Sequence, residues 1–113
     1  MKTGESVAEQ EPPLSCNPAE FTAEERAKWQ ELAKRFVKAP RARRDLPNGY
    51  AFEIDRAPET LREVGEFVEY ESRCCPFVDF TLKVPAGGRT VVLELTGTRG
   101  VKELIASELG LDP

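Results

Sequence analysis

The sequence predicts a small α+β protein whose helices and strands follow the order α-β-α-β-β-α. Three observations carry this prediction. Apolar residues recur at helical spacing in three longer segments, and they alternate with polar residues in three shorter ones. Proline and glycine lie at the boundaries between these segments. A chain of 113 residues is long enough for one domain with one hydrophobic core.

The first helix is predicted over residues 23–39. Thr22 and Glu25 have the spacing of a capping box, and Pro40 ends the helix. Its apolar face consists of five residues, Trp29, Leu32, Ala33, Phe36 and Val37. Residues 1–20, which precede it, are dominated by Gly, Pro, Gln and Glu without apolar periodicity. We therefore expect a flexible N-terminal tail over residues 1–20 and a single domain over residues 21–113.

The first strand and the second helix follow a turn signal at residues 46–49. Tyr50, Phe52 and Ile54 alternate with polar or small residues, which predicts a half-buried strand over residues 50–55. Pro58 is suited to the first turn of a helix, and Pro76 to its end. The second helix is therefore predicted over residues 58–74.

A β-hairpin and a third helix complete the domain. Alternating residues predict strands over 78–84 and 90–96, joined by a Pro- and Gly-rich turn. The third helix is predicted from residue 99, with Gly110 as its left-handed cap. A right-handed crossover then gives a three-stranded antiparallel sheet in the order 2-3-1, with helices on one face. This is a truncated ferredoxin-like arrangement, whose outer face we expect to be covered by the first helix or by a second subunit.

Composition excludes several classes of partner. There are 16 Lys and Arg residues against 20 Asp and Glu, a net charge of −4, so no nucleic acid is expected as a partner. The first residues lack the apolar run of a secretory signal or membrane anchor. We therefore expect a cytoplasmic protein that does not bind membranes, with a second copy or another protein as partner on the sheet face.

Arg41, Arg43 and Arg44 form a local basic cluster. Guanidinium groups hold phosphates and carboxylates through forked hydrogen bonds. These three arginines are therefore candidate contacts for an anion or for a protein partner. A short solvated loop is the alternative interpretation of the same residues.

The chemistry of the chain depends on three cysteines, because the sequence contains no histidine. Cys74 and Cys75 are adjacent at the predicted end of the second helix, and Cys16 lies in the predicted tail. Pro76 disfavours helical geometry at Cys75, so a break between the two cysteines lets both sulfur atoms face one ion. Three thiolates are suited to soft ions such as Hg(II), Cu(I), Cd(II), Zn(II) or trivalent arsenic. We therefore predict a metal or metalloid site at Cys74, Cys75 and Cys16.

Three neighbours of the double cysteine are expected to support the site. Phe77 provides an apolar wall, and Arg73 offsets part of the negative charge that Glu71 and the helix end contribute. No catalytic residue is predicted. Without histidine, Ser-His-Asp and Cys-His arrangements are excluded, and no C-x-x-C motif is present. The chain is thus expected to be a binding protein rather than an enzyme.

Two further interpretations of the cysteines remain open. Cys74 and Cys75 continue the apolar stripe of the second helix, so they can be core residues of a noncatalytic interaction module. Alternatively, a disulfide between Cys74 and Cys75 or between Cys16 and Cys75 would make the protein a redox sensor.

The segment Glu71-x-x-Cys74-Cys75-Pro76-Phe77, followed by two strands and a short helix, resembles a group of small, mostly uncharacterised bacterial proteins with an E-x-x-C-C-x-F segment. The resemblance covers residues 16–110. It implies one cysteine before the first helix, as at Cys16, although Cys16-Asn17-Pro18 departs from the Cys-Thr-Leu sequence expected there. Some proteins of this group accompany mercury or arsenic resistance, which implies metal binding by Cys74 and Cys75, and the resemblance does not establish an enzymatic activity.

Overall fold

A computed structural model describes residues 17–111 of the protein. A 3-10 turn, Pro18–Glu20, comes first, within the segment expected to be a tail. Helix α2 spans Ala23–Ala33 and is followed by a π-helical segment, Lys34–Lys38. Strands β1, Ala42–Leu46, and β2, Gly49–Asp55, precede helix α3, Thr60–Cys74. Strands β3, Asp79–Lys83, and β4, Thr90–Thr96, precede helix α4, Val101–Leu109.

The sheet is antiparallel throughout and has four strands in the order β1-β2-β4-β3. The prediction of three strands was wrong, because Ala42–Leu46 of the basic cluster pairs with β2 as an added edge strand. The three predicted strands keep their relative places, with β4 between β2 and β3. In the described part of the chain, β1 and β3 are therefore the two edges of the sheet.

The first helix begins as predicted, with a complete capping box. The Thr22 side chain accepts a hydrogen bond from the Glu25 N–H, and the Glu25 carboxylate accepts one from the Thr22 N–H. Regular α-helical geometry ends at Ala33, and the Ala39 N–H donates to the Lys34 carbonyl at 3.0 Å in the wider π pattern. The apolar face predicted for this helix is buried.

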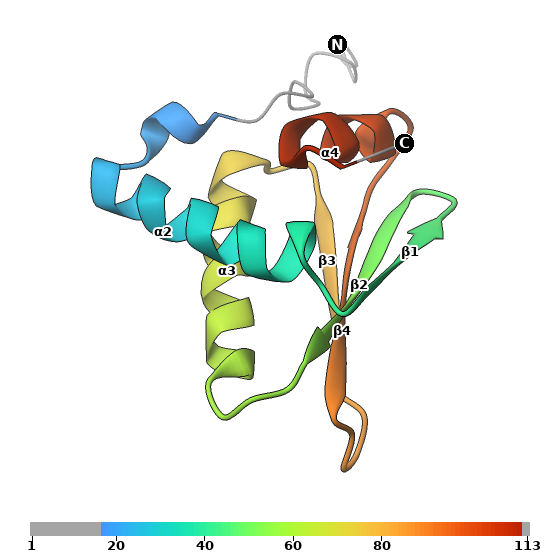
Figure 1. The fold of residues 1–113 in the computed structure, drawn as a ribbon. Helices are drawn as coiled ribbons and strands as arrows, with labels where there is room; N and C mark the ends of the chain where they lie inside the picture. The colour runs from blue at the N-terminus through green and yellow to red at the C-terminus, as the bar shows by residue number, and fades with distance from the viewer. Residues whose placement is uncertain (1–16, 112–113) are drawn as a thin grey trace, which may run out of the picture.

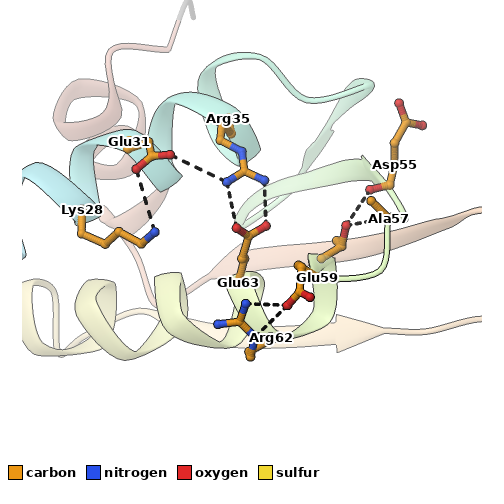
Figure 2. A network of polar contacts seen from close by, with 9 residues as sticks. Lys28, Glu31, Arg35, Asp55, Ala57, Glu59, Arg62 and Glu63 are labelled. Atoms are coloured by element: carbon orange, nitrogen blue, oxygen red, sulfur yellow. Dashed lines mark hydrogen bonds and ion pairs between the residues drawn. The ribbon is translucent and has the colours of Figure 1, made fainter.

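Helix α3 starts two residues later than predicted, at Thr60. The Thr60 hydroxyl accepts a hydrogen bond from the Ala57 N–H at 2.7 Å and donates one to the Asp55 carbonyl at 3.2 Å. These bonds fix the turn between β2 and α3 (Figure 2). Helix α4 also starts two residues late, at Val101, and ends at Gly110 in the predicted left-handed conformation.

Charged side chains join the first two helices at their surface. Arg35 donates from both terminal nitrogen atoms to the Glu63 carboxylate, at 3.2 and 2.8 Å, and Glu31 lies 4.0 Å from Arg35 (Figure 2). Lys28 in turn lies 3.9 Å from Glu31. Exposed ion pairs contribute little free energy, but the bidentate geometry between Arg35 and Glu63 fixes how α2 and its π segment lie on α3.

One hydrophobic core lies between the helices and one face of the sheet. Helices α2 and α3 lie together on that face, and α4 packs on β2 and β4 near one end of the sheet (Figure 1). Inward residues of the central strands include Phe52 and Leu93, which lie opposite each other and are fully buried. The first helix therefore does not cover the outer face, where Val92 is half-buried. No helix among residues 17–111 is long and apolar enough to cross a membrane.

Candidate thiol site

The double cysteine lies where helix α3 ends. Cys74 is the last helical residue, and Cys75 has φ −127° and ψ 78°, outside helical geometry, as expected for a residue before proline. The Cys75 N–H still donates to the Glu71 carbonyl at 2.7 Å, which closes the last turn. The two sulfur atoms are 3.7 Å apart, and each residue is 1% exposed within the hydrophobic core. The backbone break thus brings the two adjacent sulfur atoms to the same side.

The two cysteines differ in chemical state. Cys74 is a free thiol. Burial, and then the negative charge of Glu71, raise the pKa of the Cys74 thiol from 9.0 to about 12, so it is protonated at neutral pH. Cys75 is disulfide-bonded. Cys16, the third predicted ligand, lies outside the described residues.

Glu71 is a buried carboxyl group beside this site, with an exposed fraction of 1%. The indole N–H of Trp29 donates to its Oε1 atom at 2.7 Å. Burial raises the pKa of Glu71 from 4.5 to about 7, although the indole hydrogen bond lowers it in part. Near neutral pH the carboxyl group is thus close to half-protonated. Trp29 was not among the predicted site residues. A buried indole N–H usually has a hydrogen-bond acceptor, and this requirement is the signal that could have indicated a contact between Trp29 and a buried polar group.

A short segment before the first helix lies against the end of α3. The Asn17 N–H donates to the Cys74 carbonyl at 3.0 Å, and Arg26 of α2 donates to the Pro18 carbonyl at 3.2 Å. The Phe21 ring is 5% exposed, and its centroid is 5.7 Å from that of Trp29 and 5.7 Å from that of Tyr70. We call Asn17–Thr22 the N-terminal latch.

Arg73 and Phe77, two of the predicted supporting residues, make contacts beside the double cysteine. Arg73 forms an ion pair with Glu25 at 3.3 Å, and its guanidinium carbon lies 5.1 Å from the centroid of the Phe21 ring. Arg73 therefore holds the latch and α2 to α3. Phe77 is partly buried and packs against the core.

The basic cluster is not brought together as one site. Arg41 forms an ion pair with Asp55 at 2.9 Å. Arg43 and Arg44 are successive residues of β1, so their side chains lie on opposite faces of the sheet. Arg43 lies on the helix side, 5.5 Å from the centroid of the Tyr50 ring.

Residues 17–111 contain no group of three or more His, Cys, Asp or Glu side chains arranged to hold a metal ion. The predicted site would therefore be complete only with Cys16, which the described range does not include. In comparisons with known proteins, the chain matches no family model, no curated protein and no solved structure. Its function must therefore be argued from the residues themselves.

Proposed function

We propose that the protein is a thiol redox sensor whose reversible bond joins Cys75 to Cys16. The observation that carries this proposal is that the two adjacent cysteines at the end of α3 differ in chemical state. Cys75 is disulfide-bonded, whereas Cys74 is a free thiol. The sequence contains only one other cysteine, Cys16. The next residue, Asn17, is hydrogen-bonded to Cys74, which supports a partner at this place.

The proposed reaction is a two-electron exchange. Hydrogen peroxide oxidises the thiols of Cys16 and Cys75, one S–S bond forms, and two molecules of water leave. A dithiol reductant returns two electrons and two protons, and becomes a disulfide itself. Cys74 remains a thiol in both states, because its raised pKa leaves little thiolate to react. In a reducing compartment, such as the predicted cytoplasm, the bond would form only under oxidation.

Thiol counting in redox buffers tests this proposal. The native protein is treated with mild peroxide and then unfolded, so that every free thiol can be alkylated. Mass spectrometry should then count three alkylated cysteines in the reduced protein and one, Cys74, in the oxidised protein. The midpoint potential should be more positive than about −300 mV, because structural disulfides lie below that value. Cys16→Ser should abolish the bond, and the matched control Cys74→Ser should keep it. A bond that resists reduction, or an unchanged thiol count after oxidation, contradicts the proposal.

A second candidate function is binding of a soft metal or metalloid by the reduced protein. The separation of the Cys74 and Cys75 sulfur atoms, 3.7 Å, favours it. Two thiolates on one zinc ion, at about 2.3 Å each in a tetrahedral arrangement, lie about 3.8 Å apart. Cys16 would be the third ligand. Binding must displace the Cys74 proton, so affinity should rise with pH.

Native mass spectrometry of the reduced protein with limiting Hg(II), Zn(II), Cu(I) or As(III) tests the second candidate. We expect one ion per chain, lost in Cys74→Ser/Cys75→Ser and weakened in Cys16→Ser. An adduct of equal abundance in all three proteins would exclude these ligands. If neither metal nor oxidant acts on the thiols, the alternative of an interaction module with core cysteines would remain, because both cysteines are buried.

A further inference from the structure

We infer that the bond at Cys75 controls whether the N-terminal latch stays docked on α3, and thereby whether solutes reach Cys74. The inference rests on the proposed redox function and adds a conformational response to it. Two contacts join the latch to the site. Asn17 is hydrogen-bonded to Cys74, and the Phe21 ring lies against Trp29 and Tyr70.

The latch lies against the residue that carries the free thiol. The Asn17 N–H donates to the Cys74 carbonyl at 3.0 Å, and it also lowers the pKa of the Cys74 thiol, against the larger effect of burial. Cys74 and Cys75 are each only 1% exposed while the latch is docked. A reductant or alkylating agent therefore reaches the thiols only through a local opening of the fold, and we assign that opening to the latch.

The latch has few contacts of its own. Its 3-10 turn has no side-chain cap, and Asn17, Ala19 and Glu20 are exposed. The capping box of α2 begins at Thr22, the last residue of the latch. A covalent bond at the residue before Asn17 would hold the segment next to Cys74 at high effective concentration. Reduction removes that tether and leaves the backbone hydrogen bond of Asn17 and the Arg26 contact. The Phe21 ring also keeps its contacts with Arg73, Trp29 and Tyr70.

Opening of the latch also changes the environment of Trp29. This residue is the single tryptophan of the sequence, and its indole packs near the Phe21 ring and donates to the Glu71 carboxyl group. Displacement of Phe21, whose ring centroid lies 5.7 Å from that of Trp29, should make the indole more accessible to water. The emission of Trp29 and its quenching by acrylamide therefore report on the latch, independently of the thiols.

The experiment compares the oxidised protein, the reduced protein and Cys16→Ser. Alkylation of Cys74 is followed with time, located by fragment mass spectrometry, and Trp29 quenching is measured on the same samples. We expect Cys74 to react at least ten-fold faster in the reduced protein and in Cys16→Ser, with stronger quenching in both. Phe21→Ala should raise quenching and the Cys74 rate in the oxidised protein, and the control Phe80→Ala should change neither.

The outcomes separate the two proposals. In one outcome, thiol counting shows reversible oxidation while the rate of Cys74 alkylation and the quenching of Trp29 stay constant. In that case the inference about the latch is overturned and the redox function stands. If Cys75 cannot be reduced, the redox function fails. The Cys16→Ser variant then tests separately whether the bond keeps the latch docked. Unchanged Cys74 alkylation and Trp29 quenching in that variant overturn the inference.

Discussion

Glu71 and Trp29 form the least expected polar contact of the core. They lie 42 residues apart in the sequence, on α3 and α2, and join through a hydrogen bond of 2.7 Å. A carboxyl group in this environment is stable as a neutral acid and costly as an anion. Its negative charge also opposes thiolate formation at Cys74. The protonation state of Glu71 thus affects both the stability of the fold and the reactivity of the thiol.

The stability of the protein should fall as pH rises from about 4.5 to about 7. In this window the folded protein keeps a proton on Glu71 that the unfolded chain has lost, because the pKa of Glu71 is raised from 4.5 to about 7. The loss amounts to about 3 kcal/mol and is complete above pH 7. Urea denaturation of wild type and Glu71→Gln at pH 5 and pH 8 measures it as the difference between the two proteins.

Glu63→Gln is the matched control for this measurement. The Arg35 guanidinium lowers the pKa of Glu63, so its contribution is lost only as pH falls below the usual carboxyl range. Its stability relative to wild type should therefore be the same at pH 5 and pH 8. Equal pH slopes for wild type and Glu71→Gln would contradict the role assigned to Glu71.

Trp29→Phe should destabilise the protein more at pH 8 than at pH 5. The substitution keeps an aromatic ring but removes the only hydrogen-bond donor found for the Glu71 carboxylate among residues 17–111. A buried group that loses its partner costs about 1–3 kcal/mol, and the cost is greatest when the group is charged. A double-mutant cycle with Glu71→Gln measures the coupling by denaturation. Strictly additive effects at pH 8 would show that the hydrogen bond contributes nothing.

At the scale of elements, the helices were more predictable than the sheet. Capping residues and apolar spacing located three helices, because these signals are local. Strand β1 was missed, since Ala42–Leu46 lacks apolar alternation and is mostly exposed. Its strand geometry comes from pairing with β2, a tertiary interaction that no local pattern records.

Two glycines provide a matched test of these packing arguments. A Cβ atom added at Gly49 would lie 1.9 Å from the Leu95 carbonyl oxygen, whereas one added at Gly65 in α3 would meet nothing within 4 Å. Gly49→Ala should therefore destabilise the protein by roughly 2 kcal/mol or more, because backbone atoms of β2 and β4 must separate. Gly65→Ala should stabilise it by about 1 kcal/mol through helix propensity. Denaturation of both variants checks the signs, and the same sign for both would contradict this packing.

At the scale of the whole molecule, the sequence predicted the class of fold, the antiparallel sheet and the double cysteine at a helix end. It did not predict that Asn17 and Phe21 pack on that end, because the contact joins residues that are distant in the sequence. The role of the thiols as ligands or as a redox centre stays a prediction. The truncated ferredoxin-like arrangement likewise stays a prediction, as do the cytoplasmic location and a protein partner.

The oxidised protein should be more stable than the reduced protein by about 2–4 kcal/mol. A bond from Cys16 to Cys75 closes a long loop and so restricts the unfolded chain more than the folded one. Urea denaturation with and without a dithiol reductant measures the difference, and Cys16→Ser should match the reduced wild type. Identical midpoints in both conditions would argue against the bond.

The two edges of the sheet differ in chemistry. Strand β1 carries three successive charged residues, Arg43, Arg44 and Asp45, at the centre of one edge. Strand β3, at the other edge, has exposed Leu82, and Val84 follows it. Charges protect an edge strand from pairing with other chains, so the β1 edge is the better protected of the two, although β3 also carries Asp79 and Lys83. If two copies did pair through β3, each outer edge of the joined sheet would be a β1 strand, and the charges of β1 would oppose the addition of a third copy.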